Sequence, residues 1–391
     1  MRRIAIVTGT RAEYGLLRWL IEDLKENLNV TLQLVVTGSH LSREHGYTYD
    51  LILNDGHVAD YLVDISVDGD GGSDVARSMG KATVGFTECF DQLKPDLIVV
   101  LGDRFEILSA AQVALPMRIP VAHIHGGEVT EGAIDDSIRH AVTKLSHLHF
   151  ASCEEYRNRI LQLGEDPHCV WDTGSIALDN FERLNLLSRQ EVMEKYCGIS
   201  HDGKLALLTY HPTTLYPEDD LAILENIITA LMEIEDVVVI ATEANADAGG
   251  KQINRRLREV SRKIDRVKVF SNLGQLGYLS VLRESDVVIG NSSSGIVEAP
   301  SVKTATLNVG NRQDGRLKAP SIIDVDGSLA SIRSALSFTF SIEMERVMRS
   351  LTSPFGIAGA TSKISKILST FELRGLLVKK FHDIPGMGLT K

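Results

Sequence analysis

Residues 96–140 constrain the fold more than any other part of the chain. Their hydrophobic pattern predicts a buried strand over 96–101, then a helix, then a second short strand over 120–124. A polar cluster follows each strand at once, GDR at 102–104 and HGGE at 125–128. Because ligands bind at the carboxyl ends of the strands in open parallel α/β sheets, these clusters predict a ligand site at one edge of a sheet.

This predicted edge is rich in charged side chains. It carries four carboxylates, one arginine and one histidine: Asp103, Glu128, Asp135, Asp136, Arg104 and His125. Carboxylates at the edge of a sheet repel one another unless a substrate or a cation offsets their charge. These residues therefore predict a functional site before any motif is considered.

Strand–helix alternation continues along the whole chain. At 391 residues the chain exceeds a single ordinary core, so two domains are expected. About six strands with crossover helices over residues 1–175 predict a doubly wound parallel sheet, and the pattern restarts over 176–364. We expect an α/β protein with two Rossmann-like domains and a cleft between them. A C-terminal helix over about 365–391 is expected to cross back to the first domain.

Composition excludes several classes of protein. The chain is 43% hydrophobic and 24% charged, and its apolar runs are strand-sized, which argues against a membrane protein. The four apolar residues after the N-terminal arginines are too few for the core of a signal peptide. Four cysteines without CxxC spacing are typical of reduced thiols in the cytoplasm. A formal charge of −11 without a basic stripe argues against nucleic acid as a partner.

The serine-rich segment GNSSSG at 290–295 follows a strand and is expected to open a helix. Its backbone amides, the helix N-terminus and the hydroxyls of Ser292 and Ser293 favour binding of an anion, although a serine-capped turn is the alternative. The segment has neither the lysine of a P-loop nor GxGxxG, which disfavours ATP and NAD. Glu298 suits two ribose hydroxyls, or else is a solvated acid in the first helical turn.

Arginines and one histidine follow other strand ends. Arg11, Arg104 and Arg312 each have glycine close by, and guanidinium groups match phosphate oxygens. One such arginine is more often a surface ion pair, but three at equivalent positions favour an anionic ligand. His211, in YHPTT, either acts on a leaving diphosphate or proton, or is satisfied by the backbone of its own turn.

A zinc site has to be considered, because His123 and His125 form an HxH pair and three more histidines follow (His140, His147 and His149). The pair lacks the second-shell carboxylate spacing of a zinc signature. We therefore predict neither a catalytic metal nor a cofactor.

A family resemblance rests on the motifs TGTRAEYG, GSHL, LGDRFE, HIHGGEVTEGAIDDSIRHAVTKLSH, YHPTT, NADAG, GNSSSG and GNRQDGR. Over residues 1 to about 316, the chain resembles the hydrolysing UDP-N-acetylglucosamine 2-epimerases of sialic acid biosynthesis. The non-hydrolysing branch has threonine after the Gly-Asp pair, arginine after the histidine, and Asp-Ser-Gly-Gly in the serine segment. In this chain Arg104 follows the Gly-Asp pair, Pro212 follows the histidine, and the serine segment begins with Asn291. These differences favour the hydrolysing branch.

The resemblance implies a GT-B fold whose active site converts UDP-N-acetylglucosamine and water to UDP and N-acetylmannosamine, by elimination to a glycal and rehydration. It implies UDP contacts from Arg11, Gly15, Arg104, His211, Asn245, Ser292, Ser293, Glu298 and Arg312. Carboxylates matching Asp103 and Asp135 would move protons, with Asp136 as the alternative to Asp135. Many relatives have glutamate in place of His125, so either His125 or Glu128 takes that role. A homodimer is expected from the family and from the prevalence of dimers among soluble enzymes.

Three other functions stay open at the level of sequence. The same chemistry on a UDP- or GDP-linked 2,4-diacetamido-2,4,6-trideoxyhexose, on the route to legionaminic acid, differs only in the sugar. A GT-B glycosyltransferase would instead pass the sugar to an acceptor. A nucleotide-sugar sensor would not need several carboxylates beside a diphosphate.

Overall fold

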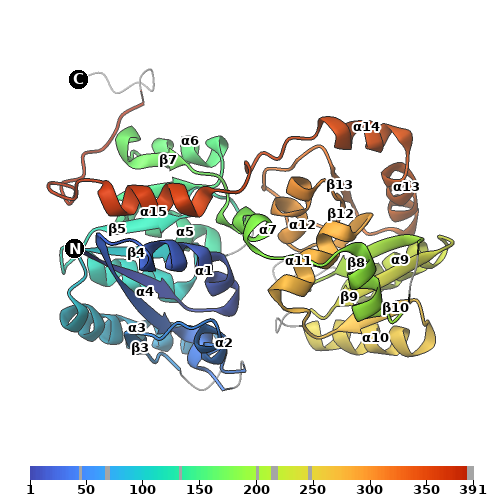
Figure 1. The fold of residues 1–391 in the computed structure, drawn as a ribbon, viewed down its shortest axis with the longest axis horizontal. Coiled ribbons are helices and arrows are strands. Elements are labelled where there is room, and N and C mark those ends of the chain that lie inside the picture. The colour runs from blue at the N-terminus through green and yellow to red at the C-terminus, as the bar shows by residue number, and fades with distance from the viewer. Residues whose placement is uncertain are drawn as a thin grey trace. The chain divides into compact units, whose positions relative to one another are not determined.

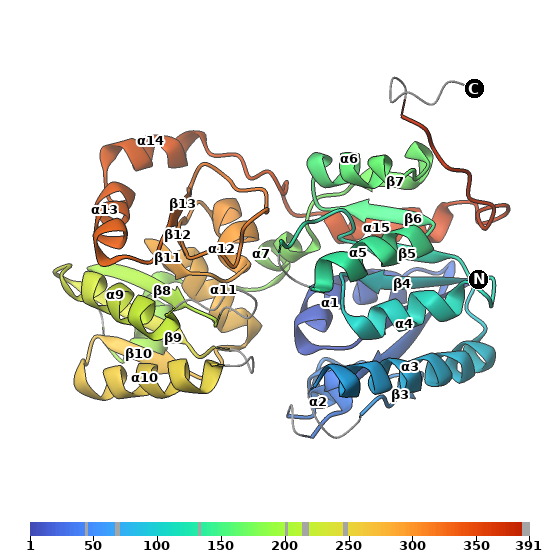
Figure 2. The same ribbon diagram turned by 180° about the vertical axis from the view of Figure 1, so that it is seen from behind.

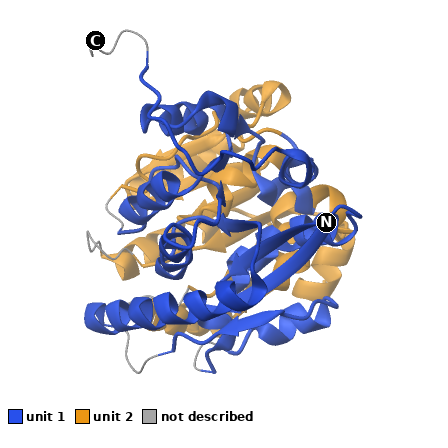
Figure 3. Ribbon diagram, turned by 90° about the vertical axis from the view of Figure 1, so that its left-hand side faces the viewer, with its two compact units in different colours: residues 1–129, 133–180, 357–391 blue, residues 130–132, 181–356 orange. Residues whose placement is uncertain are grey.

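The computed structural model describes residues 1–43, 46–66, 71–131, 134–199, 202–212, 219–244 and 249–384. The chain forms two compact units (Figure 3). Unit 1 comprises Met1–Val129, Ala133–Asn180 and Ile357–Lys391, and unit 2 comprises Thr130–Gly132 and Phe181–Gly356.

Unit 1 is built on a parallel sheet of seven strands in the order β3-β2-β1-β4-β5-β6-β7. The strands are β1 Arg2–Thr8, β2 Val30–Thr37, β3 Tyr61–Val63, β4 Leu97–Leu101, β5 Val121–Ile124, β6 Leu148–Ala151 and β7 Val170–Asp172. The chain order reverses between β1 and β4, so their carboxyl ends flank the crevice at which such sheets bind ligands. The strands at 96–101 and 120–124 thus form as expected.

Helices cover both faces of this sheet (Figure 1) (Figure 2). Ile4 and Ile6 of β1 join a core layer with α1 and α15, and Ala5 and Val7 join the opposite layer with α3 and α4. The helices are α1 Arg11–Lys25, α2 Tyr49–Asn54, α3 Gly72–Leu93, α4 Phe105–Ala114, α5 Ile134–Leu145, α6 Glu154–Gln162 and α15 Ala360–Thr370, with short 3-10 turns at Gly38–Leu41, Pro167–Cys169 and Ile176–Leu178.

The C-terminal helix differs from the expectation. It spans Ala360–Thr370, and residues 371–384 form turns and extended chain instead of more helix. The Asp179 carboxylate accepts hydrogen bonds from the first N–H groups, at 3.1 Å from Ala360 and 2.7 Å from Thr361. At the other end, the Arg2 guanidinium donates to the Leu368 and Phe371 carbonyls, which fixes the last turn through charge and hydrogen bonds. The helix packs on α1 and belongs to unit 1.

Unit 2 repeats the architecture with a parallel sheet of six strands in the order β10-β9-β8-β11-β12-β13. The strands are β8 Lys204–Thr209, β9 Val237–Thr242, β10 Val267–Phe270, β11 Val287–Gly290, β12 Ala305–Val309 and β13 Ile322–Val325. The sequence pattern missed β13, because this edge strand is short and buries only Val325 among its four residues.

The helices of unit 2 also pack on both faces. Ala206 and Leu208 of β8 lie in the layer beneath α9, α10 and α13, whereas Leu205 and Leu207 lie beneath α8 and α11. Unit 2 has α8 Arg189–Val192 with a π-turn Met193–Cys197, α9 Asp220–Met232, α10 Gly250–Lys263, α11 Gly274–Glu284, α12 Ser294–Val297, a 3-10 turn Ala299–Val302, α13 Leu329–Thr339 and α14 Ile342–Ser350; α7 Asp179–Arg183 links the two units. Across the described residues, every helix is too short or too polar to cross a bilayer.

Candidate active site

Arg139 organises the carboxylates at the edge of unit 1. Its side chain is only 3% exposed, and its Nη2 donates to the Asp103 carboxylate. Its Nη1 donates to the Glu128 carbonyl at 3.0 Å and lies 3.5 Å from Oδ1 of Asp136, one turn earlier on α5. The structure therefore brings together the loops after β4 and β5 and the start of α5, as the strand pattern predicted. Sequence reasoning assigned no role to Arg139, although it lies within the motif DDSIRH.

Asp103 has the electrostatic character of an acid or base. Burial raises the pKa of its carboxyl, the Arg139 guanidinium opposes this, and the charges of Asp135 and Glu128 raise the pKa further. A raised pKa brings a carboxyl closer to the range in which general acids and bases work. Asp135 thus lies near enough to Asp103 to act on its charge.

His125 adopts an uncommon backbone conformation beside Glu128. Its φ of 62° lies in the left-handed region, which non-glycine residues rarely occupy outside functional or strained sites. Its N–H donates to the Phe150 carbonyl at 2.8 Å, and its Nδ1 lies 3.5 Å from Oε1 of Glu128. The Ser152 hydroxyl donates to the same Glu128 oxygen at 2.9 Å. The two sequence candidates for the second proton-transfer group are therefore neighbours.

His123 and His149 are structural. His123 is fully buried, with Nε2 2.8 Å from the Gly102 carbonyl and Nδ1 3.2 Å from the Thr143 hydroxyl, and burial lowers its pKa to about 3. His149 lies 3.1 Å from the buried Glu165 carboxylate. Among the described residues, His, Cys, Asp and Glu side chains form no group of three or more that could hold a metal ion.

The predicted UDP ligands of unit 1 lie at the starts of two helices. Arg11 begins α1 and is exposed, and Gly15 follows one turn later. Arg104 precedes α4, with 42% of its side chain exposed, and its Nε donates to the Glu106 carboxylate at 2.7 Å. The arginine edge of the site is thus partly open to solvent.

Asn291 joins the predicted anion-binding residues of unit 2. Its buried side chain accepts a hydrogen bond from the His211 N–H at 2.7 Å and donates to the His211 carbonyl at 2.8 Å. Its own carbonyl accepts from Nη1 of Arg312 at 3.0 Å and Nε2 of Gln313 at 2.8 Å. The preceding Gly290 has φ 132°, and a Cβ there would lie 1.9 Å from the Thr209 carbonyl oxygen. The serine segment, His211 and Arg312 therefore form one cluster.

The serine segment opens a shorter helix than expected. The helix α12 is a single turn that ends before Pro300, so its dipole is smaller than that of a full helix. Ser293 is exposed at its N-cap, and the hydroxyls of Ser292 and Ser294 lie 3.1 Å apart. The Tyr278 hydroxyl forms a further hydrogen bond with Ser294, which sequence reasoning did not find. The segment therefore offers an anion mainly the hydrogen-bond donors of its serine hydroxyls, and the helix dipole contributes less.

Glu298 follows the serine segment at the end of α12. Burial raises the pKa of its carboxyl to about 7, and the Arg316 charge opposes the shift. Such a carboxylate suits hydroxyl donors better than it suits phosphate oxygens. The remaining predicted ligand, Asn245, lies outside the described residues.

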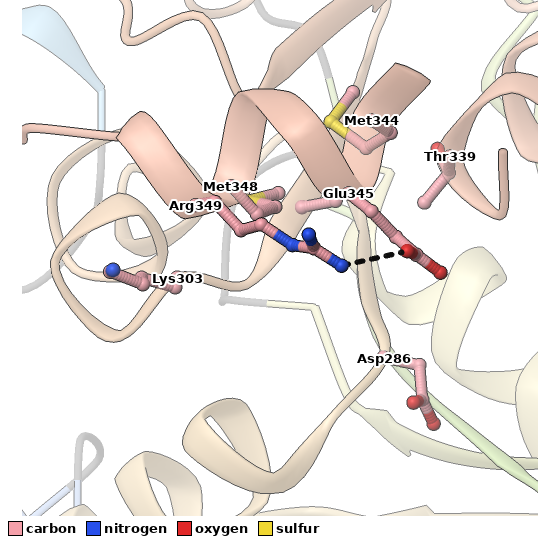
Figure 4. A pocket seen from close by; sticks show the side chains of 8 residues that line it. Asp286, Lys303, Thr339, Met344, Glu345, Met348 and Arg349 are labelled. Carbon is pink, nitrogen blue, oxygen red and sulfur yellow. Dashed lines mark ion pairs between the residues drawn. The ribbon is translucent and has the colours of Figure 1, made fainter. Parts of the chain in front are cut away.

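A cavity of about 310 Å³ lies elsewhere in unit 2 (Figure 4). Asp286 and Lys303 line it just before β11 and β12, and α14 contributes the Glu345–Arg349 ion pair at 3.7 Å. It is thus at the amino ends of these strands and contains none of the predicted site residues.

Comparisons with known proteins show which family the chain resembles. The model of a family described as UDP-N-acetylglucosamine 2-epimerase matches residues 22–369. The GDP/UDP-N,N′-diacetylbacillosamine 2-epimerase (hydrolyzing) of Campylobacter jejuni is 42% identical over 324 residues, which cover 83% of this chain and 84% of that protein. The UDP-N,N′-diacetylbacillosamine 2-epimerase (hydrolyzing) of Legionella pneumophila is 35% identical over 336 residues, which cover 86% of this chain and 88% of that protein.

A solved structure shows the same fold. The UDP-GlcNAc 2-epimerase of Neisseria meningitidis, bound to UDP-GlcNAc, superposes with a TM-score of 0.73 at 19% identity, over 94% of this chain and 99% of that one. With the parallel sheets of seven and six strands, this confirms the expected GT-B type of fold with two Rossmann-like domains. The chain belongs to the UDP-N-acetylglucosamine 2-epimerase family.

Proposed function

We propose that the protein is a hydrolysing 2-epimerase of a nucleotide-linked 2,4-diacetamido-2,4,6-trideoxyhexose. It releases UDP or GDP and the free sugar, inverted at C2. The observation that carries this proposal is the pairing of the buried Arg139 with Asp103 amid Glu128, Asp135 and Asp136. This cluster supplies proton-transfer groups that mere binding of a nucleotide would not need.

The choice of sugar departs from the first expectation. The sequence motifs pointed to UDP-N-acetylglucosamine, whereas the relatives at 42% and 35% identity are both named for N,N′-diacetylbacillosamine, a sugar of the trideoxyhexose class. These names support the sugar that the sequence left as the alternative. UDP-N-acetylglucosamine is the second candidate, because the family model carries its name.

The leaving diphosphate has to be stabilised first. The hydrogen at C2 of the sugar is not next to a carbonyl, so it becomes removable only as the C1–O bond breaks and positive charge develops at C1. Donors arranged in advance lower the cost of this charge separation. In unit 2, Ser292, Ser293 and Arg312 provide such donors, with His211 as a further group for the diphosphate. Glu298 would accept hydrogen bonds from the ribose hydroxyls.

The carboxylates of unit 1 then move protons. We assign removal of the C2 hydrogen to Asp103, which leaves a glycal with a C1–C2 double bond and a free nucleoside diphosphate. A second group returns a proton to the opposite face of C2 while water adds its hydroxyl at C1. Glu128, Asp135 and Asp136 lie near Asp103 or Arg139, and His125 lies beside Glu128, so these four are the candidates for this step. Two groups with separated pKa values are needed for such an exchange.

A panel of nucleotide sugars tests the proposal. The protein is incubated without an acceptor in deuterium oxide, and UDP or GDP and the free sugar are quantified. We expect equal amounts of diphosphate and sugar from the diacetamido-trideoxyhexose, with deuterium at C2. Product without deuterium would exclude the glycal route, and no release without an acceptor would favour a glycosyltransferase or a sensor.

We also propose a cytoplasmic homodimer. The four free cysteines support a reducing compartment, and two-fold dimers are the commonest soluble oligomers. Light scattering of the purified chain would test the dimer.

A further inference from the structure

A buried carboxylate, Glu106, lies where three loops of unit 1 meet. Glu106 is the second residue of α4 and is fully buried. Its Oε1 accepts the 2.7 Å hydrogen bond from Nε of Arg104. A Cβ on Gly9 would lie 2.6 Å from that oxygen, and a Cβ on Gly38 would lie 3.0 Å from it. The carboxylate therefore fills the space beneath the loops that follow β1 and β2, as well as the loop that follows β4.

Glu106 leaves the outer part of the Arg104 guanidinium available. Only Nε of Arg104 is engaged by Glu106, and the guanidinium carbon lies 5.8 Å from the centre of the Phe105 ring. Within the described residues Arg104 makes no other side-chain hydrogen bond, and 42% of its side chain is exposed. Anchoring by Nε fixes the plane of the group and leaves its terminal N–H groups to receive two oxygens of one anion.

A second buried carboxylate, Glu13, lies near Glu106. Glu13 is 8% exposed, and its Oε2 accepts hydrogen bonds from the N–H groups of Gly9 at 2.7 Å and Thr10 at 3.1 Å. Oε1 of Glu13 and Oε2 of Glu106 are both buried and have no hydrogen-bond partner in the described part of the chain. Burial and the nearby Glu106 charge raise the pKa of Glu13 to about 8, against the opposing charge of Arg104.

Glu13 therefore keeps its proton at neutral pH. With Glu13 protonated, Glu106 pairs with Arg104, and Glu13 adds no negative charge to oppose an incoming anion. The other carboxylate that acts on the charge of Arg104 is Asp135. Ionisation of Glu13 would add a negative charge beside the anion site and weaken it.

We propose that Glu106 is a positioning residue, which holds Arg104 by its Nε so that the terminal N–H groups are set for a phosphate oxygen of the nucleotide sugar. This inference rests on the proposed function, since it takes a nucleoside diphosphate as the ligand. An arginine fixed in advance loses less conformational freedom on binding than a mobile one. Glu106 itself touches no ligand.

A double-mutant cycle tests the proposal, with UDP affinity as the readout. Glu106→Gln and Arg104→Met are each expected to weaken UDP binding about tenfold. The double variant is expected to bind no more weakly than Arg104→Met alone, because Glu106 acts through Arg104. Effects that multiply to about a hundredfold would show that Glu106 acts independently and would overturn the proposal. Glu225→Gln, which breaks the surface pair with Arg256, is the control and should leave UDP affinity unchanged.

The pH dependence gives a second readout that does not need a Glu106 variant to fold. UDP affinity of the wild-type protein is expected to fall between pH 7 and pH 9 as Glu13 ionises. Glu13→Gln, which imitates the protonated acid, should remove that fall. An equal fall in both proteins would overturn the role of the Glu13 proton. Because these measurements use UDP alone, coupling without hydrolysis of any nucleotide sugar would refute the proposed function and leave the inference intact, whereas hydrolysis without coupling would do the reverse.

Discussion

Arg139 donates a hydrogen bond to Asp103 from a side chain that is 3% exposed, so the positive charge beside this carboxylate is fixed in place. Burial raises the pKa of the Asp103 carboxyl, and the Arg139 charge keeps that rise smaller than burial alone would make it. The pair thereby sets the pH at which Asp103 exchanges a proton.

Removal of the Arg139 charge should move the acidic limb of the activity profile. In Arg139→Met, the Asp103 pKa rises because the cation that favoured its ionised form is gone. The limb of kcat against pH is expected to move to higher pH by about one to two pH units. Arg139→Lys keeps a positive charge and should move the limb less. An unchanged limb in Arg139→Met would show that Asp103 is not the group that titrates.

Asp103→Asn should separate turnover from binding. The amide keeps the shape of the side chain but cannot accept the C2 proton, so kcat is expected to fall about a thousandfold. UDP affinity should change by less than about threefold, because we place the diphosphate on other residues. The matched control is Asp96→Asn at the opposite end of β4, where Asp96 pairs with Arg3 on the surface. Equal losses of turnover and UDP affinity would mean that Asp103 only holds the nucleotide.

Glu298 should make nucleotide binding pH-dependent in the opposite sense to Glu13. Its pKa of about 7 means that it takes up a proton as the pH falls below neutrality, and it then accepts hydrogen bonds less well. The affinity for a UDP-sugar is expected to be about tenfold lower at pH 6 than at pH 8. A UDP-sugar is the better probe, since the terminal phosphate of UDP itself titrates near pH 6. Glu298→Gln should bind weakly at both pH values; a retained pH dependence would contradict the assignment.

Gly127 should be intolerant of any side chain. It has φ 78°, and a Cβ there would lie 2.3 Å from the Tyr156 carbonyl oxygen. Gly127→Ala is expected to lower the free energy of unfolding by about 3 kcal/mol and to disturb the neighbouring His125 turn. Gly56→Ala is the control, because Gly56 has φ 81° but no atom within 4 Å of the added methyl group. The difference between the two variants, measured by denaturant unfolding, isolates the clash; equal losses would attribute the effect to backbone strain alone.

The sequence pattern correctly predicted those features of the fold that depend on residues close together in the chain. Strand β4 is an uninterrupted apolar run and β5 is interrupted only by His123, and a polar cluster follows each strand at once. The type of these strands, their ends and the charged edge beyond them could therefore be predicted from the order of residues along the chain. The same reasoning placed His211 and Ser292 after strands of the second sheet, where the structure has them. Strand β13 was not predicted, because its partly exposed residues show no clear alternation of buried and exposed positions.

The sequence by itself thus determined the alternation of strands and helices, the division into two α/β folds and the residue types at their ligand edges, because each follows from side chains near in the chain. Only the tertiary structure decided that Arg139 is buried against Asp103, that Asn291 ties His211 to the serine segment, and that Glu106 lies beneath Gly9 and Gly38. These contacts join residues on separate loops, and the pairing of an ion or an amide depends on the packing that removes it from water. The hydrophobic pattern of a short stretch of sequence does not show how distant loops pack together.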